Sequence, residues 1–299
     1  MGKSMFLSNR PIGIFAAGMF WIFLTVIFSC FTSVYAAKAP DLALIETGEL
    51  SRTIKNWVIL DARPKLEWQA SRIPGAHSFS WNDYTGTDKK GKPFCLKPPE
   101  ELALALGGMG INENTPIVVY GDADKSWGGE GWACWVLSWL GHKGPIRLLA
   151  GGIQAWRNEK GGLEPVEVES EQAASKPVRY RVNLRTELEV QTIELEQKAD
   201  AMVLIDTRST AEWLMGHIPG AIHINWSEFY TGEDRHPLDP QALKKLLKER
   251  GADISKPVVY YCTGGVRSAY TCAIHHICGL PPARNYYGGM EDWKRRPSQ

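Results

Sequence analysis

Short apolar runs alternate with polar, helix-prone stretches along most of the chain. The runs Trp57–Leu60, Met202–Ile205 and Val258–Tyr261 predict buried β-strands. The stretches Pro240–Arg250 and Ser268–Ile277 predict helices. Strands that alternate with helices predict an α/β fold, in which a mostly parallel sheet is covered by helices on both faces.

One segment occurs twice. Residues 60–81 and 205–226 are identical at nine of 22 positions, at a constant offset of 145. Two copies of one domain account for this similarity. The stretch 164–175 carries four glutamates and no helical apolar period, which is typical of a linker. We therefore expect a first domain at residues 41–163, a linker at 164–183 and a second domain at 184–299.

The N-terminus predicts export. Pro11–Ala37 are 27 residues without a charged side chain, and they follow the basic Lys3 and Arg10. A basic start, an apolar middle and small residues at the end are the parts of a secretory signal, here residues 1–36. An uncleaved membrane anchor is an alternative, because about 20 apolar residues span a bilayer. A lipid attached at Cys30 is another. Each option places the remaining chain in the periplasm or outside the cell.

Composition and charge exclude several classes of protein. The content of 44% hydrophobic and 22% charged residues is that of an ordinary globular chain. A net charge of +1 provides no basic field for nucleic acid. Six cysteines in 299 residues are too few for a disulfide-stapled scaffold. No HExxH, CxxC or GxxxxGK[ST] motif is present. We expect a monomer without a cofactor or metal ion and, after signal cleavage, without membrane contact.

Cys262 has the most distinctive chemical setting. It follows a predicted strand directly and opens a loop that leads into a predicted helix. Its sulfur would face backbone N–H groups and the positive end of the helix dipole, which both favour the thiolate. Gly264 and Gly265 allow the loop to fold tightly, and Arg267 adds a fixed cation. The pattern predicts a nucleophilic cysteine that receives an anion.

The first copy lacks this nucleophile. The residue after its second strand is Gly121, and the longer loop that follows contains Asp122 and Asp124, which would repel an anion. We expect a non-catalytic first domain that covers the cleft of the second. Asp206 and Arg208 recur in both copies and are expected to support the fold behind the site. The remaining cysteines of the two domains are expected to fill space: Cys95, Cys134, Cys272 and Cys278.

These features together resemble the rhodanese family, in particular its tandem-domain sulfurtransferases. The resemblance is carried by Asp206-x-Arg208, Glu212-Trp213, the segment 216–221, the Cys262 loop and Tyr287-Gly288-Gly289-x-x-x-Trp293. It implies that a thiolate takes the outer sulfur of a small-molecule donor, forms a persulfide, and passes the sulfur to cyanide or a thiol. The loop N–H groups would hold the terminal sulfur, as an oxyanion is held elsewhere; they belong to Thr263, Gly264, Gly265, Val266 and Arg267.

Several functional alternatives stay open at this point. Thiosulfate is the expected donor, followed by polysulfide and 3-mercaptopyruvate. Arg267 could grip an anionic donor or could pin the loop to the sheet. A sulfur carrier without turnover is a second function. A cysteine phosphatase or arsenate reductase is a third, disfavoured because four residues separate Cys262 from Arg267, one fewer than a phosphate cradle needs.

Overall fold

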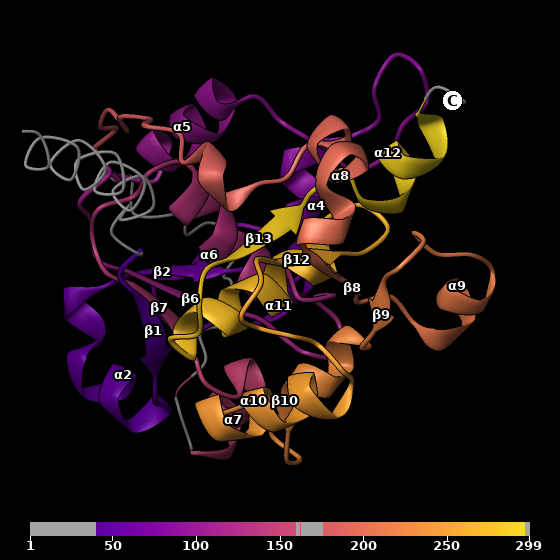
Figure 1. Cartoon of the computed structure of the whole chain (residues 1–299). Helices are drawn as coiled ribbons and strands as arrows, with labels where there is room; N and C mark the ends of the chain where they lie inside the picture. The colour runs from indigo at the N-terminus through magenta and orange to yellow at the C-terminus, as the bar shows by residue number, and fades with distance from the viewer. Residues whose placement is uncertain (1–39, 160–161, 163–175, 297–299) are drawn as a thin grey trace, which may run out of the picture. The chain divides into compact units, whose positions relative to one another are not determined.

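The computed structural model describes residues 40–159, 162 and 176–296 (Figure 1). The expected signal, residues 1–36, and the first part of the expected linker, residues 164–175, lie outside these ranges. Within the described ranges no helix is both long enough and apolar enough to cross a membrane.

The first repeat is built on a five-stranded parallel sheet with the order β1-β7-β6-β2-β3. Its strands are β1 (Leu42–Ile45), β2 (Val58–Asp61), β3 (His77–Ser78), β6 (Ile117–Tyr120) and β7 (Ile146–Leu149). Its helices are α2 (Thr47–Thr53), η1 (Ile54–Asn56), α3 (Lys65–Ala70), α4 (Trp81–Tyr84), α5 (Pro99–Gly108), α6 (Gly129–Trp139) and α7 (Gly152–Asn158). A small hairpin is formed by β4 (Thr85–Gly86) and β5 (Cys95–Leu96).

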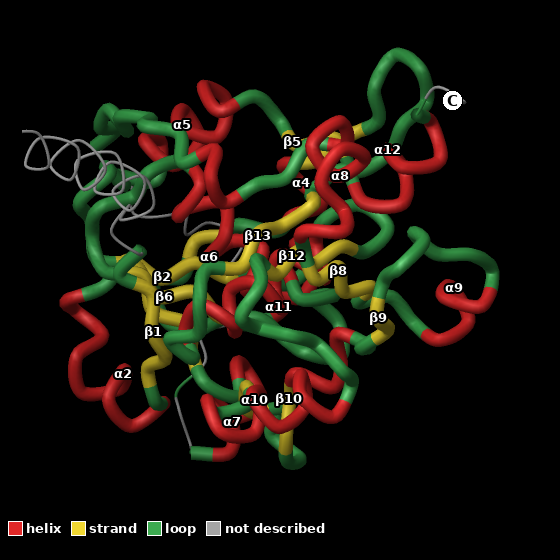
Figure 2. Tube along the Cα trace, viewed as in Figure 1, coloured by secondary structure: helices red, strands yellow, loops and turns green. Residues whose placement is uncertain are grey.

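The second repeat has the same plan with a four-stranded parallel sheet of order β13-β12-β8-β9, whose strands lie side by side in Figure 2. Its strands are β8 (Val203–Asp206), β9 (Ile222–His223), β12 (Val258–Tyr261) and β13 (Ala283–Tyr286). Its helices are η2 (Thr186–Leu188), α8 (Thr192–Lys198), η3 (Ala199–Ala201), α9 (Thr210–Leu214), η4 (Trp226–Phe229), α10 (Pro240–Glu249), α11 (Val266–Ile277) and α12 (Gly289–Arg295). Its hairpin is formed by β10 (Tyr230–Thr231) and β11 (His236–Pro237).

The central strands are apolar throughout because both of their faces are buried. Along β12, Val258 and Tyr260 join the core shared by the two repeats, whereas Val259 and Tyr261 join a separate core on the other face. The α/β fold class and the parallel, doubly covered sheets are confirmed.

The helix after Cys262 begins earlier than predicted. The pattern placed its start at Ser268, but α11 starts at Val266. The reason is Gly265, whose φ of 84° lies in the left-handed region and turns the chain directly into the helix. Val266 and Arg267 therefore belong to the first helical turn.

The two repeats share one hydrophobic core, and α6 packs on α11 at its centre. This approach depends on glycine. A Cβ atom at Gly131 would lie 2.3 Å from Cα of Tyr270, and one at Gly128 would lie 2.8 Å from its Cβ. The described part of the expected linker also lies on the first repeat, where the N–H of Val178 donates to the carbonyl of Gly107.

Two histidines at the end of α11 predict a loss of stability in mild acid. His275 Nε2 contacts the Pro281 carbonyl at 2.8 Å, and His276 Nε2 contacts the Ala283 carbonyl at 2.8 Å. Burial lowers the pKa of each imidazole to about 4, against the opposing effect of these carbonyls. In the unfolded chain these two histidines take up protons near pH 6.5, whereas in the folded chain they do so only near pH 4. The free energy of unfolding should therefore decrease as the pH falls from about 6.5 to about 4, by at most about 1.4 kcal/mol per pH unit for each histidine.

Urea unfolding across that pH window measures the effect. His276→Gln keeps an N–H donor but cannot be protonated, so its stability should fall less steeply than that of the wild type. His217→Gln, which removes an exposed histidine, should leave the slope unchanged. Equal slopes in the wild type and His276→Gln would show that this histidine does not control acid stability.

Candidate active site

Cys262 directly follows β12 and is almost completely buried, with 2% of its surface exposed. The N–H of Gly265 donates to its Sγ at 3.1 Å, and the hydroxyl of Ser268 lies 3.6 Å from the same atom. A Cβ atom at Gly265 would lie 2.5 Å from the carbonyl oxygen of Tyr287, so no larger residue fits this turn. The loop thus brings Cys262 and the start of α11 together, as the sequence predicted.

The segment 287–293, which carries the last of the motifs, hydrogen-bonds to the backbone of the Cys262 loop. The N–H of Met290 donates to the Cys262 carbonyl at 2.9 Å, and the N–H of Glu291 donates to the Thr263 carbonyl at 3.1 Å. Gly289 is needed for this contact, because a Cβ atom there would lie 2.4 Å from the Cys262 carbonyl oxygen. The carbonyls of Cys262 and Thr263 thus bond to α12, whereas the N–H of Gly265 bonds to the sulfur.

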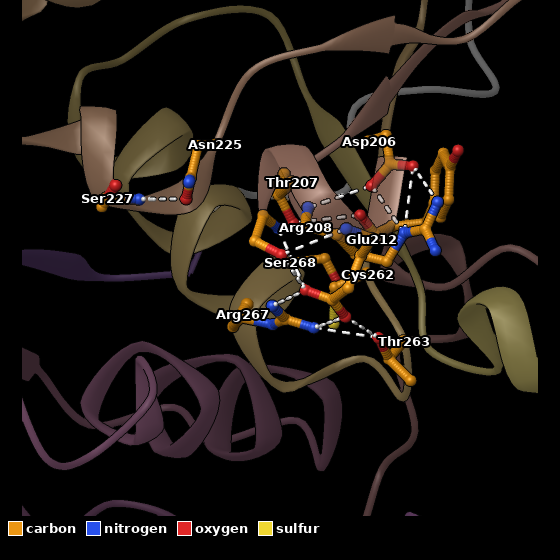
Figure 3. A network of polar contacts seen from close by, with 12 residues as sticks. Asp206, Thr207, Arg208, Glu212, Asn225, Ser227, Cys262, Thr263, Arg267 and Ser268 are labelled. Carbon is orange, nitrogen blue, oxygen red and sulfur yellow. Dashed lines mark hydrogen bonds and ion pairs between the residues drawn. The ribbon is translucent and has the colours of Figure 1, made fainter. Parts of the chain in front are cut away.

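The guanidinium of Arg267 forms an ion pair with the carboxylate of Glu212. Its two terminal nitrogens donate to the two carboxylate oxygens of Glu212 at 2.7 and 2.8 Å, and Thr263 Oγ1 donates to the same carboxylate at 2.7 Å (Figure 3). Burial would raise the pKa of Glu212, but the hydrogen bonds from Arg267 and Thr263 outweigh it and hold this pKa well below its usual range. Burial would lower the pKa of Arg267, but the hydrogen bonds to Glu212 and the interaction with Cys262 raise it. Both groups therefore stay charged.

Asp206 and Arg208 form a buried clamp at the end of β8. Arg208 donates its backbone N–H at 2.9 Å and two guanidinium N–H groups to Asp206, with the closest contact at 2.6 Å, and also binds the Gly216 carbonyl at 2.8 Å. Asp61 and Arg63 form the same clamp at the end of β2, with the same 2.6 Å contact. Asp206 and Arg208 thus tie the strand end to the turn that follows α9.

Two aromatic residues of the first repeat reach the Cys262 loop. A Cβ atom at Gly264 would lie 2.3 Å from Cγ of Phe94, so the ring lies directly against the loop backbone. The ring centroid of Trp127 lies 5.4 Å from Cζ of Arg267, and 55% of this side chain is exposed. Phe94 and Trp127 both have positive φ, at 60° and 55°. Such backbone is rare for residues with large side chains, and it often marks a functional site.

The comparison with protein families identifies the fold. The model of the rhodanese-like domain matches residues 46–159 and again residues 190–296. The chain belongs to the rhodanese family.

Several curated relatives of this rhodanese are similar over most of their length. A probable 3-mercaptopyruvate sulfurtransferase of Pseudomonas aeruginosa is 27% identical over 274 residues, which cover 80% of this chain and 91% of the relative. The thiosulfate sulfurtransferase of Rattus norvegicus is 26% identical over 287 residues, which cover 85% of this chain and 92% of the relative. The sulfur carrier protein TtuD of Thermus thermophilus is 28% identical over 252 residues, covering 76% and 84%. The comparisons support an enzyme of the sulfurtransferase class.

Solved structures agree on the fold. The 3-mercaptopyruvate sulfurtransferase SseA of Escherichia coli has a TM-score of 0.72 at 22% identity, covering 82% of this chain and 98% of that one. An anaerobic ergothioneine biosynthesis enzyme of Chlorobium limicola has a TM-score of 0.74 at 19% identity, and the match covers 85% of this chain and 68% of that one. Both matches concern the architecture alone.

Sequence reasoning about this rhodanese overlooked Glu212, Phe94 and Trp127 as parts of the site. Glu212 had a signal, because the first repeat keeps Glu67 at the same position, where it pairs with Lys125 of its own loop at 2.7 Å. A glutamate kept before each tryptophan could have indicated a partner in the loop. Phe94 and Trp127 had no such signal, since they come from the other repeat.

The other described cysteines differ from Cys262 in their setting, since none of them follows a strand into a glycine loop. All are free thiols, and Cys134 and Cys272 are completely buried. Burial raises the pKa of both and raises that of Cys278 to about 11. Across residues 40–159, 162 and 176–296, no three His, Cys, Asp or Glu side chains are grouped so that they could hold a metal ion.

The contact between Gly264 and Phe94 predicts a specific pair of variants. Gly264→Ala should lower activity at least tenfold and destabilise the protein by about 1–3 kcal/mol, because the added methyl group meets Cβ and Cγ of Phe94. Adding Phe94→Gly should restore stability, since glycine removes the ring and accepts the positive φ. Gly86→Ala is the control, because nothing lies within 4 Å of a Cβ atom there. Thermal unfolding and steady-state rates measure both effects. If Phe94→Gly brings no recovery, the ring is not the obstacle.

Proposed function

We propose that this rhodanese transfers the outer sulfur of thiosulfate to cyanide or a thiol through a persulfide on Cys262. The observation that supports this most directly is the short N–H contact of Gly265 with the Cys262 sulfur, at 3.1 Å. A backbone donor there, at the start of α11, stabilises negative charge on sulfur without a cofactor.

The proposed reaction has two displacement steps. The Cys262 thiolate attacks the outer sulfur of thiosulfate, the S–S bond of the donor breaks, and sulfite leaves with the electron pair. The acceptor then attacks the terminal sulfur of the persulfide, and Cys262 leaves as the thiolate. Cyanide would give thiocyanate. The two steps together consume no oxidant or reductant, and no proton has to be moved when thiosulfate and cyanide react.

The binding roles follow from how the loop is held. The N–H groups of residues 263–267 would surround the terminal sulfur of the persulfide. In support of this, the N–H of Gly265 contacts the Cys262 sulfur, and the carbonyls of Cys262 and Thr263 bond to α12 instead. We propose that Arg267 attracts the anionic donor while Glu212 fixes its orientation. Asp206 and Arg208 would support the loop from the neighbouring strand without touching the substrate.

The organisation of the chain is part of the same proposal. Residues 41–163 would form a non-catalytic domain and residues 184–299 the catalytic one, joined by 164–183. Residues 1–36 would direct export, so that the protein acts in the periplasm or outside the cell. We expect a monomer that needs only the sulfur donor and the acceptor.

A sulfur carrier without turnover is the main competing function, and the similarity to TtuD is the observation that favours it. Steady-state turnover on thiosulfate, polysulfide and 3-mercaptopyruvate, with cyanide or a thiol as acceptor, separates the two functions. We expect repeated turnover, fastest on thiosulfate. A single stoichiometric transfer on every donor would support the carrier.

Replacing the Cys262 thiol tests whether the persulfide forms on this residue. Cys262→Ser should abolish sulfur transfer, and intact-mass analysis after thiosulfate treatment should show one added sulfur atom on the wild type only. Cys95→Ser is the matched control, because Cys95 is a partly exposed thiol of the first repeat and should be dispensable. Sulfur found equally on other cysteines would contradict a persulfide on Cys262.

Variants of Arg267 and Glu212 distinguish two roles of Arg267, attraction of the anionic donor and support of the loop. Arg267→Ala should reduce thiosulfate turnover by one to two orders of magnitude, mainly through KM, because a lost charge-assisted bond costs about 1.5–3 kcal/mol. Arg267→Lys should recover part of this loss, since it keeps the charge without the planar fork. Glu212→Gln removes the opposing charge and should lower the KM for thiosulfate. If Glu212→Gln instead raises KM as much as Arg267→Ala does, Arg267 acts by pinning the loop.

A further inference from the structure

The position of the missing cysteine in the first repeat is occupied by a carboxylate. Gly121 follows β6 as Cys262 follows β12. A Cβ atom at Gly121 would lie 2.2 Å from Oε2 of Glu130, so the carboxylate takes the space of the absent side chain. Glu130 is the second residue of α6, and Arg267 is the second residue of α11. Each helix follows a left-handed glycine, so the first repeat has an acid where the catalytic repeat has its cation.

This carboxylate lines a small cavity together with other unsatisfied oxygen atoms. The cavity has a free volume of about 10 Å³, enough for one particle the size of a water molecule. Three of its lining residues carry a buried polar atom without a hydrogen-bond partner among the described residues: Glu130 Oε2, Gln154 Oε1 and Tyr270 Oη. Glu130 is 5% exposed and Tyr270 is fully buried. Buried polar atoms normally have hydrogen-bond partners, so three such atoms around one cavity favour a site for a small bound partner.

Neighbouring contacts fix the orientation of two of these oxygens. Tyr230 donates its hydroxyl to the other oxygen of Glu130 at 2.5 Å. The amide nitrogen of Gln154 donates to Asp122 at 2.7 Å, so its carbonyl oxygen remains without a donor. The ligand must therefore satisfy two acceptors and a phenol oxygen that can also accept.

The electrostatics favour a positive charge in the cavity. Arg235 also lines it, but this side chain is half-exposed and pairs with Asp124 at 3.3 Å. Glu130 is the one carboxylate among the lining residues, and no ion pair to it is found among the described residues, whereas Arg235 is paired with a residue outside the lining. We propose that the cavity binds one monovalent cation the size of ammonium or potassium, held by Glu130, Gln154 and Tyr270. This site does not depend on the proposed sulfur transfer.

Proton competition gives the site a pH dependence. Burial raises the pKa of Glu130, against the hydrogen bond from Tyr230, so a proton competes with the cation for this carboxylate. The other titratable groups around it come from every neighbouring element: Asp122 of the loop, Cys134 of α6, Tyr230 of β10, Arg235 of the hairpin and Tyr270 of α11. Burial raises the pKa of Tyr230 and Tyr270 as well, which keeps both phenols neutral. Cation binding should therefore strengthen as the pH rises.

Thermal unfolding of the purified protein tests the proposal. In chloride salts of equal ionic strength, potassium and ammonium should raise Tm saturably relative to choline, which is too large for the cavity, and the rise should grow with pH. Comparing potassium with ammonium distinguishes a coordinated ion from a hydrogen-bond donor. Equal Tm values in all salts would overturn the proposal and leave a bound water molecule.

Variants of the lining residues test whether the rise in Tm comes from cation binding in this cavity. Glu130→Gln keeps the size of the side chain and should abolish the difference between potassium and choline. Glu113→Gln changes another largely buried carboxylate of the same repeat and should keep that difference. Gln154→Leu, which removes one ligand oxygen, should weaken the apparent cation affinity about tenfold and covers the case in which Glu130→Gln does not fold. An undiminished cation effect in Glu130→Gln or Gln154→Leu would overturn the proposal. An anomalous peak of rubidium between the three oxygen atoms would support it directly.

Discussion

The close approach of α6 to α11 is the contact on which the functional arrangement depends. It requires the glycines at 128 and 131, because any side chain there would overlap Tyr270. With the helices this close, each hairpin extends onto the other repeat. Phe94, just before β5, reaches the catalytic loop, and Arg235, just before β11, reaches the loop of the first repeat. The repeats therefore complete each other's loop regions.

Negative charge on a buried sulfur has to be balanced without losing nucleophilicity. Glu212 offsets part of the positive charge that Arg267 brings close to Cys262. The N–H of Gly265 and the dipole of α11 stabilise an anion at a fixed place. This arrangement would suit the proposed change of the sulfur from thiolate to persulfide and back, because the same N–H group and dipole would serve both states.

The two loops have diverged in opposite electrostatic directions from one backbone plan. After a left-handed glycine, the catalytic repeat places a cation near a thiol, whereas the first repeat places Glu130 where the thiol would be. Lys125 and Arg267 both pair with the glutamate that precedes the tryptophan of their own repeat. An ion pair to the glutamate of α3 or α9 is thus retained in both repeats, although the chemistry of the loop is not.

The sequence by itself determined the tandem α/β domains, the buried strands and the place of Cys262 between a strand and the loop that leads into a helix. These properties rest on local signals: alternating apolar runs, a repeated segment, and a cysteine between a strand and two glycines. Only the tertiary structure decided what surrounds that cysteine. Glu212, Phe94 and Trp127 arrive there from distant segments, and the positive φ of two bulky aromatic residues is not visible in their identity. Contacts across a domain interface depend on shape complementarity, which a local pattern of residues does not encode.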